Sequence, residues 1–292
     1  MKTEKLILGT VQFGMDYGIN NKNGRPDSAE IEKILDHAFE SGIGMLDTAE
    51  RYGNSQQSIG DYHRGRDCKF DLITKLDFSS IKSEEELNQR VEGAINKLNV
   101  SGLYCCMFHT FSALESNYSN HESAFQKLIT DKKVAKLGVS LHSNAEFEQA
   151  LAYDIVSIIQ LPFNLFDNEN SRGNMLRKAR DQGIEIHVRS VFLQGLFFKD
   201  PESISYKLQP FLKYLRLLGE IAKDCEMSIN QLALSYVMMQ EDIDKVLIGV
   251  DNQSQLIENI ENADFDLPSD VIEEINTINM KDNELLNPAN WS

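Results

Sequence analysis

Residues 28–47, Ser-Ala-Glu-Ile-Glu-Lys-Ile-Leu-Asp-His-Ala-Phe-Glu-Ser-Gly-Ile-Gly-Met-Leu-Asp, join two patterns that together decide the fold of this chain. In residues 28–40 apolar side chains recur every three or four positions, which is typical of an amphipathic helix. Residues 44–47 form a short apolar run that ends in a carboxylate and shows no alternation of apolar and polar side chains. Such runs are typical of strands buried on both faces, as in parallel sheets covered by helices.

The same succession of helical segment and short apolar run continues in both directions along the chain. Seven further runs rich in Val, Ile or Leu are predicted as strands: residues 6–8, 71–76, 103–108, 134–139, 155–161, 184–191 and 246–250. The helices predicted between them include residues 83–98, 228–239, 252–260 and 269–278, and Gly183 marks a helix end. Ser83 and Glu86 have the spacing of a capping box, with the Glu86 carboxylate reaching back to the Ser83 amide. Eight strands alternating with helices indicate a parallel α/β fold.

The organisation of the chain favours one closed barrel over two doubly wound domains. Six prolines, no block of like charges and no low-complexity segment leave no linker near the middle of the sequence. A (β/α)8 TIM barrel of eight parallel strands typically takes about 250 residues. Residues 1–292 are therefore expected to form a single domain of this kind, with residues 280–292 as a tail near the barrel mouth. In such a barrel the chemistry takes place at the C-terminal ends of the strands.

Charge and composition exclude several classes of partner. The chain has 29 Lys and Arg against 45 Asp and Glu, a formal net charge of −16, whereas nucleic acids and anionic membrane surfaces are bound by basic proteins. No apolar run approaches the roughly 18 residues of a membrane span, and the N-terminal residues do not resemble a signal peptide. The four cysteines, Cys68, Cys105, Cys106 and Cys225, lack the spacing of metal ligands. A cytoplasmic protein without a bound metal is therefore predicted.

Polar side chains of four different kinds stand at the ends of three consecutive predicted strands. Asp47 ends the second strand and Tyr52 follows five residues later, whereas Lys75 and His109 stand at the ends of the third and fourth strands. Asp47 beside Lys75 would form an ion pair, and Lys75 beside Tyr52 would favour the tyrosinate form. A tyrosine tuned in this way can give its proton to a carbonyl oxygen that gains negative charge. His109 would orient the carbonyl group or share the proton.

These residues belong to a pattern that resembles the aldo-keto reductase family. Residues 46–55, Leu-Asp-Thr-Ala-Glu-Arg-Tyr-Gly-Asn-Ser, are similar to its signature Asp-Thr-Ala-x-x-Tyr-Gly, and shorter matches follow in order over nearly the whole chain. The resemblance implies that Asp47, Tyr52, Lys75 and His109 form the catalytic tetrad, with Tyr52 as general acid. It further implies hydride transfer from a nicotinamide cofactor, NADPH or less often NADH, to a small-molecule carbonyl substrate.

The resemblance also assigns residues to the cofactor. Ser140 and Gln160 carry over as contacts of the nicotinamide carboxamide. The other cofactor contacts that it implies are Gly9, Thr10, Asp47, Arg189, Ser190, Leu193, Gly195, Asp251, Gln255, Glu258 and Asn259.

Two departures from the family pattern lie at the nicotinamide end of the site. Leu141 stands where the family often has an asparagine after the fifth strand, and the next residue, His142, is a candidate substitute. Arg189 stands where many members have a tyrosine that stacks on the nicotinamide. A guanidinium group can stack on an aromatic ring. The hypothesis is that Arg189 favours the reduced cofactor, or turns toward a pyrophosphate or an acidic substrate.

A third departure lies at the adenosine end. Residues 246–259 contain no Lys or Arg and carry Asp251 and Gln255, whereas a 2′-phosphate favours charge-assisted donors. Two interpretations remain open. Either the protein uses NADH or both cofactors, or it uses NADPH and cations from other parts of the chain bind the 2′-phosphate. The first interpretation is favoured. Because the first strand begins within the first half-dozen residues, the bottom of the barrel is expected to be closed by side chains alone.

Substrate choice is expected in the segments that surround the barrel mouth. These are a polar loop at residues 110–121, the segment 14–19, the loop with Phe197, Phe198 and Lys199, and the tail, where Trp291 is either a pocket wall or a surface residue. Polar loops favour a hydroxylated carbonyl compound such as a sugar, in line with a similarity to bacterial reductases of sugar or polysaccharide metabolism.

Two other functions are weighed against a reductase. The first is a cofactor-binding barrel that senses redox state with little turnover, and the intact tetrad disfavours it. The second is a lyase or epimerase with Lys75 as a Schiff base, which the absence of a phosphate-binding glycine loop after the seventh or eighth strand disfavours. The oligomeric state is not predicted.

Overall fold

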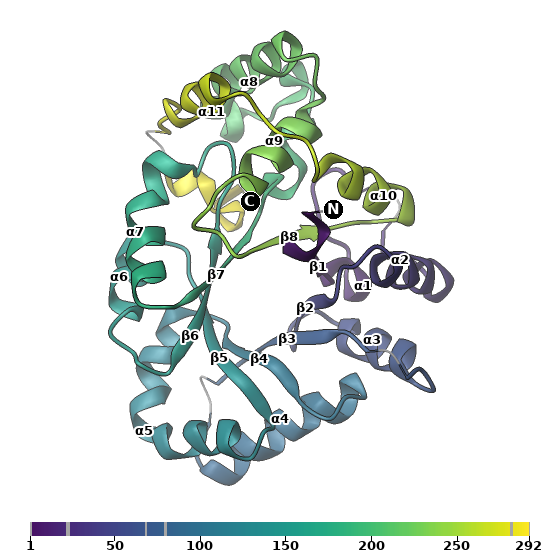
Figure 1. The fold of residues 1–292 in the computed structure, drawn as a ribbon, viewed down its shortest axis with the longest axis vertical. Helices are drawn as coiled ribbons and strands as arrows, with labels where there is room; N and C mark the ends of the chain where they lie inside the picture. Colours follow the sequence, from purple (N-terminus) through teal and green to yellow (C-terminus); the bar gives the residue numbers. More distant parts are fainter. Residues whose placement is uncertain (1, 22–23, 68, 79–80, 281–282, 292) are drawn as a thin grey trace.

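The computed structural model describes residues 2–21, 24–67, 69–78, 81–280 and 283–291, which contain a closed barrel of parallel strands (Figure 1). Its strands are β1 (Leu6–Gly9), β2 (Met45–Ala49), β3 (Asp71–Leu76), β4 (Leu103–Phe108), β5 (Val134–Ser140), β6 (Val156–Pro162), β7 (Glu185–Arg189) and β8 (Lys245–Gly249). They follow one another around the barrel in chain order, and β8 pairs with β1 to close it. The predicted TIM barrel is confirmed: β3 and β4 have the predicted ends, and the ends of the other strands differ from the prediction by at most two residues.

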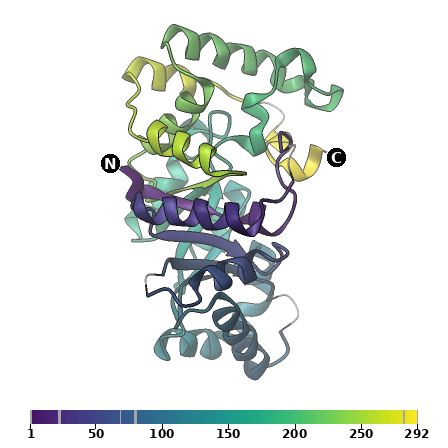
Figure 2. The ribbon, with the colours of Figure 1, turned by 90° about the vertical axis from the view of Figure 1, so that its right-hand side faces the viewer.

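Helices between consecutive strands form the outer layer. Long elements are α2 (Ser28–Glu40), α3 (Ser55–His63), α4 (Glu84–Leu98), α5 (Phe111–Thr130), α7 (Glu169–Asp181), α8 (Leu212–Asp224), α9 (Ile229–Met238), α10 (Gln253–Asn262) and α11 (Ser269–Asn276). Short elements are α1 (Val11–Gly14), α6 (Asn144–Ala150), η1 (Lys2–Lys5), η2 (Leu193–Phe198), η3 (Pro201–Ser203), η4 (Tyr206–Phe211), η5 (Asn283–Leu286) and η6 (Pro288–Trp291). The pair α8 and α11 lies at the end of the long axis opposite to α4 and α5 (Figures 1 and 2). No helix within the described ranges is both long and apolar enough to cross a membrane.

The unit α2–β2 illustrates how the sequence forms these layers. The Asp27 side chain caps α2 by accepting a hydrogen bond from the Glu30 amide at 2.8 Å. Apolar side chains on one helix face, such as Ile31 and Leu35, are then buried against the barrel, while all of β2 is buried. Burial of this stripe provides most of the stability of the helix, because isolated helices of this length are marginal in water.

The capping box predicted at Ser83 forms only in part. The Ser83 hydroxyl accepts from the Glu86 amide at 3.2 Å, but the Glu86 carboxylate accepts from the Lys82 amide at 3.0 Å. The carboxylate thus reaches one residue further back than predicted. Complete capping boxes occur instead at the starts of α6 and α9.

The prediction of a polar loop at residues 110–121 is wrong, because these residues form the first half of α5. Thr110 is the N-cap, and its hydroxyl accepts from the amide three residues later at 3.2 Å. Phe111, Leu114 and Tyr118, at spacings of three and four, bury their side chains on the barrel side. Ser112, Glu115 and Ser116 between them are exposed to solvent, and the polar composition of the segment concealed its helical period.

The two adjacent cysteines of β4 lie in different packing layers. Cys105 lies in a cluster with Ile7, Ile73 and other side chains of the barrel interior, whereas Cys106 lies in the larger core between strands and helices. Alternate residues of a strand point to opposite faces, so the adjacent pair cannot share one environment. Cys105, Cys106 and Cys225 are free thiols, and Cys68 lies outside the described residues.

A polar network lies at the N-terminal ends of β4, β5 and β7, at the bottom of the barrel. The Glu185 carboxylate pairs with Lys136, accepts from the Tyr104 hydroxyl at 2.8 Å, and lies 2.7 Å from Nε2 of the buried His187. Burial alone raises the pKa of the Glu185 carboxyl, but hydrogen bonds from His187 and Lys136 outweigh it and lower the pKa to about 2. The ionised carboxylate therefore stabilises the barrel bottom.

Replacing Glu185 by Gln is expected to make unfolding less sensitive to acid. The contribution of Glu185 is fully present above its ordinary pKa of 4.5 and is lost as the pH falls toward 2. The wild type should lose about 1–2 kcal/mol more unfolding free energy than the variant over this window, allowing for partial exposure. Urea unfolding at a series of pH values measures the difference. Glu92→Gln, at the exposed pair with Lys133, is the control, and equal acid sensitivity of all three proteins would contradict the prediction.

Candidate active site

A cavity of about 480 Å³ opens at the C-terminal ends of the strands. The four side chains predicted at consecutive strand ends, Asp47, Tyr52, Lys75 and His109, all line it. They come from β2, the turn that follows β2, β3 and the end of β4. The barrel topology therefore brings together residues that are far apart in the sequence.

Asp47 and Lys75 form a buried ion pair at the floor of the cavity. Lys75 pairs with Ala49 in the register of β2 and β3, so its side chain shares a sheet face with Asp47, two residues from Ala49. The Asp47 and Lys75 side chains are only 3% and 2% exposed. Burial alone lowers the pKa of Lys75, but Asp47 outweighs burial and raises the pKa. Lys75 is therefore protonated in the folded protein.

Backbone packing of two glycines places Tyr52. A Cβ atom on Gly14 would lie 1.7 Å from the Tyr52 carbonyl oxygen, and one on Gly53, which has φ +51°, would lie 2.3 Å from the Gly14 carbonyl oxygen. Only glycine at both positions lets the end of α1 and the turn after β2 touch through their backbones. This contact sets the Tyr52 ring so that Lys75 Nζ lies 5.6 Å from its centroid.

His109 is a neutral imidazole next to Tyr52. The two rings lie 6.2 Å apart between centroids and are nearly perpendicular, at 84°. Burial lowers the pKa of His109 to about 4, and the positive charges of Lys75 and Arg51 act in the same direction. Its Nδ1 atom is buried and has no hydrogen-bond partner among the described residues. The neutral ring can therefore bond an oxygen atom of a bound molecule.

Two orphaned acceptors fit the amide of a nicotinamide group. Gln160 is fully buried and donates from Nε2 to Asp47 Oδ2 at 2.9 Å, which leaves its Oε1 atom without a partner among the described residues. Gln12 Oε1 is orphaned in the same way, and both residues line the cavity. Since buried polar atoms are nearly always bonded, the cavity is suited to a ligand that carries N–H donors. The buried Ser140 lies beside Gln160 in the register of β5 and β6.

Most residues that the sequence assigns to the cofactor line this cavity. Besides Asp47, Ser140 and Gln160 they are Gly9, Thr10, Arg189, Ser190, Gly195, Asp251 and Gln255. Three others do not line it. Leu193 is fully buried in the core, Glu258 accepts a hydrogen bond from Asn230 at 2.9 Å, and Asn259 is buried on α10.

Several lining residues were missed or only partly found from the sequence. The segment after β1 contributes Tyr17 and Gly18, as predicted, and continues into Asn20 and Asn21. Gln194 of η2 donates to the Tyr17 hydroxyl at 2.9 Å, which joins the segment after β1 to the segment after β7. Residues 110–121, all described, contribute no lining residue. Only long-range packing determines which of these segments reach the mouth.

The C-terminal tail reaches the mouth through residues other than the tryptophan. Residues 287–289 line the cavity, and η5 and η6 lie at the end of the barrel opposite to η1 (Figure 2). Trp291 instead packs against Phe211, with 6.2 Å between ring centroids, and donates from Nε1 to the Leu285 carbonyl at 2.7 Å. Of the two predicted roles for Trp291, docking outside the pocket is the one observed.

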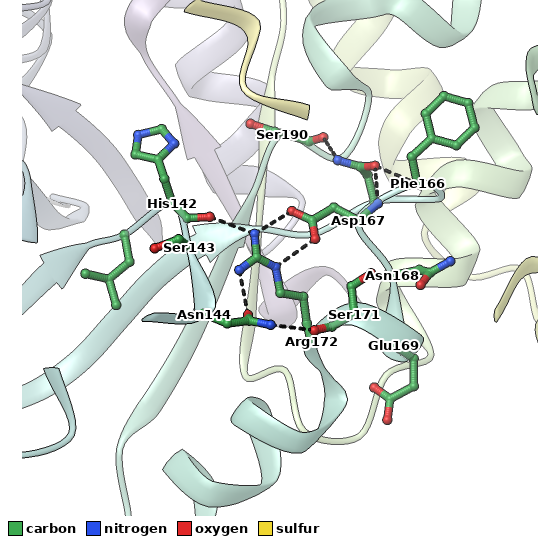
Figure 3. Close-up of polar contacts among 12 residues, drawn as sticks. His142, Ser143, Asn144, Phe166, Asp167, Asn168, Glu169, Ser171, Arg172 and Ser190 are labelled. Atoms are coloured by element: carbon green, nitrogen blue, oxygen red, sulfur yellow. Dashed lines mark hydrogen bonds and ion pairs between the residues drawn. The ribbon is translucent and has the colours of Figure 1, made fainter. Parts of the chain in front are cut away.

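A buried arginine holds the loops on one side of the cavity. Arg172 of α7 bonds both carboxylate oxygens of Asp167 at 2.7 Å, and it reaches the Asn144 side chain at 2.8 Å and the His142 carbonyl at 2.7 Å (Figure 3). These contacts fix the loop after β5 against the loop after β6. In the sequence, Arg172 looks like one more polar position on an amphipathic helix, so no local pattern predicts this network.

Arg189 lines the cavity next to this network. Its guanidinium group donates to the Leu141 carbonyl at 3.1 Å, lies 3.2 Å from Nε2 of His142, and lies 3.4 Å from the Ser190 hydroxyl. Burial and the charge of Arg189 lower the pKa of His142 to about 4, so that the ring next to Arg189 is neutral. The predicted substitute for the missing asparagine, His142, therefore lies against Arg189.

No group of three His, Cys, Asp or Glu side chains that could hold a metal ion occurs within the described ranges.

Comparisons with known proteins agree with this fold. The model of the "Aldo/keto reductase family" matches residues 5–280. The chain is 26% identical to the "Uncharacterized oxidoreductase YqkF" of Bacillus subtilis, over 89% of this chain and 90% of that protein. It is 21% identical to the "NADH-specific methylglyoxal reductase" of Escherichia coli, over 79% and 81% of the two chains. The structure of the "aldo-keto reductase AKR11C1 from Bacillus halodurans (holo form)" shares the fold with a TM-score of 0.77 at 20% identity, covering 94% and 92%.

Proposed function

The chain belongs to the aldo/keto reductase family and is an NAD(P)H-dependent oxidoreductase that reduces carbonyl groups, and on this premise we propose that Tyr52 is its general acid. The observation that carries the proposal is the convergence of Asp47, Tyr52, Lys75 and His109 on one cavity. The acceptors of Gln160 and Gln12 in the same cavity support binding of the nicotinamide there.

A bound nicotinamide cofactor would supply the hydride, and Gln160 and Ser140 would hold its carboxamide. The Tyr52 hydroxyl gives its proton to the substrate oxygen as negative charge develops on it. The protonated Lys75 stabilises the tyrosinate that is left, and Asp47 keeps Lys75 charged and in place. The neutral His109 donates a hydrogen bond to the substrate oxygen and orients the carbonyl.

The walls of the cavity favour small, polar carbonyl compounds. Tyr17, Asn20 and Gln194 line the side near the mouth, and a methylglyoxal reductase is among the relatives. The experiment is multiple-turnover oxidation of NADPH and of NADH with a panel of small aldehydes, hydroxyaldehydes and apolar ketones, followed by cofactor absorbance. Repeated turnover with polar aldehydes is expected. A single turnover that stops after one equivalent of cofactor would contradict an enzymatic role.

We further propose relaxed cofactor preference with use of NADH. Asp251 lines the adenosine end of the cavity, where its amide donates to Gln255 Oε1 at 2.7 Å and one carboxylate oxygen accepts from Asn21 at 3.3 Å. Among the described residues that line the cavity, the cations are Lys75 and Arg189, which belong to the nicotinamide end. A 2′-phosphate would therefore meet a carboxylate and amides in place of charged donors.

Kinetics with both cofactors tests this preference. The kcat/KM with NADPH is expected to exceed that with NADH by less than about 100-fold, roughly 2.7 kcal/mol. Replacing Asp251 by Asn should raise the NADPH-to-NADH ratio by about three- to tenfold, since a single partly exposed charge acts through solvent. Glu261→Gln, an exposed position on α10, the helix that follows Asp251, is the matched control. An unchanged ratio in Asp251→Asn would contradict a role of this carboxylate.

A further inference from the structure

We infer that Arg189 is the anchor of an anion subsite, and that the natural carbonyl substrate carries a carboxylate or phosphate group that binds there. The inference rests on the proposed function, because it names the substrate class of the same cavity.

The contacts of Arg189 leave its charge uncompensated. The groups that its guanidinium bonds are a backbone carbonyl, a neutral imidazole and a hydroxyl, those of Leu141, His142 and Ser190. Its Nε atom makes no hydrogen bond with any residue in the described part of the chain. The two buried cations of this region each have a carboxylate, Asp47 for Lys75 and Asp167 for Arg172. Charges withdrawn from water are normally paired, so a partner for the partly buried Arg189 is expected from a bound molecule.

The charges around the cavity point in the same direction. Four ionised residues line it, and two of them, Asp47 and Lys75, neutralise each other. Asp251 lies at the adenosine end and is bonded to Gln255 and Asn21. The end of the cavity that holds Tyr52 therefore carries the positive charge of Arg189, although the whole chain has a net charge of −16. This local excess would attract an anion and not a neutral ligand.

The position of Arg189 favours the substrate over the cofactor as the source of the anion. Arg189 follows Val188 at the end of β7 and lines the same cavity as Tyr17 and Tyr52, the proposed general acid. When the nicotinamide is oxidised it is cationic, and Arg189 beside it would be unfavourable unless an anion lies close to both. An anionic group on the substrate supplies that charge throughout the reaction.

The subsite is rigid before any ligand binds. The Leu141 and His142 backbone that holds the guanidinium is tied down by Arg172, which bonds the His142 carbonyl (Figure 3). On the other side, Asn164 donates to the Ser190 carbonyl at 3.2 Å. A guanidinium held in this way keeps free N–H donors in a planar fork, which suits the oxygens of a carboxylate or a phosphate.

Pairs of substrates that differ in charge test the inference. The carboxylate arm compares glyoxylate with methylglyoxal, and the phosphate arm compares glyceraldehyde 3-phosphate with glyceraldehyde. In the arm that matches the natural substrate, Arg189→Gln is expected to lower kcat/KM by about 30- to 100-fold more for the anionic member than for the neutral member, mainly through KM. Arg189→Lys should recover part of the loss, because it restores the charge without the fork.

A binding measurement makes the test independent of turnover. Titration calorimetry of the full chain with glycolate and with inorganic phosphate should show binding of at least one of them in the wild type and none in Arg189→Gln. The control is Arg216→Gln. Arg216 lies on α8 and forms an exposed ion pair with Glu202, so this variant should bind the anions like the wild type.

The possible failures are distinguishable. If Arg189→Gln lowers kcat/KM equally for charged and neutral substrates, or weakens cofactor binding by the same factor, Arg189 serves the cofactor and the inference is overturned. If the wild type reduces neutral aldehydes well but neither prefers nor binds anions, the inference fails while the proposed function stands. If anions bind at Arg189 but no aldehyde is turned over, the proposed function fails and the subsite remains.

Discussion

Replacing Tyr52 by Phe is expected to lower kcat for carbonyl reduction by about 10³-fold, while the Kd of the nicotinamide cofactor changes by less than about twofold. The substitution keeps the ring that lies 6.2 Å from the His109 ring and 5.6 Å from Lys75 Nζ. It removes only the hydroxyl group, which in our proposal holds the proton for the substrate oxygen. Steady-state kinetics and a fluorescence titration with the reduced cofactor measure the two quantities.

The matched control for this variant is Tyr62→Phe. Tyr62 lies on α3 outside the cavity and donates its hydroxyl hydrogen bond to Asp36 at 2.8 Å. Its loss should alter stability slightly and leave kcat close to the wild-type value. Retained activity in Tyr52→Phe would show that another group, such as His109 or a water molecule, donates the proton. Loss of cofactor affinity together with activity would indicate that Tyr52 acts through the shape of the cavity.

The part of the site that the sequence predicted is the part that the barrel topology determines. Asp47 lies in β2, Lys75 lies near the end of β3 and His109 directly follows β4, and consecutive strands of a closed parallel barrel are neighbours. Once the runs at residues 44–47, 71–76 and 103–108 are recognised as strands, their C-terminal residues have to meet. Tyr52 is brought to the same place by the turn after β2 and by the glycine contact with α1.

The rest of the site depends on contacts between loops, which no local pattern encodes. Arg172 was missed because its partner, Asp167, and the His142 carbonyl come from different connections. Residues 110–121 have a polar composition, but burial of Phe111 on the barrel decides their helical state. The sequence left two positions open for Trp291, in the pocket wall or on the surface. Its contact with Phe211 decides between them, and Phe211 lies 80 residues earlier in the chain.

Removing one member of the buried Asp47–Lys75 pair is expected to cost about 3–5 kcal/mol of unfolding free energy, because the remaining charge is left uncompensated. Lys75→Met leaves Asp47 with the Gln160 amide as its remaining hydrogen-bond donor. Asp47→Asn keeps an acceptor for Gln160 but leaves Lys75 without a counter-charge. Both single variants should lose activity, since Tyr52 then lacks a fixed cation beside it.

The double variant Asp47→Asn/Lys75→Met separates stability from chemistry. With both charges removed it should be within about 1–2 kcal/mol of the wild type, a coupling of at least about 4 kcal/mol between the two sites. Its activity should stay as low as that of either single variant, because no cation remains to stabilise a tyrosinate. Guanidinium unfolding and steady-state kinetics on the four proteins complete the cycle. Additive losses of stability would mean that the two charges act independently, whereas recovered activity would mean that Tyr52 does not need Lys75 for proton transfer.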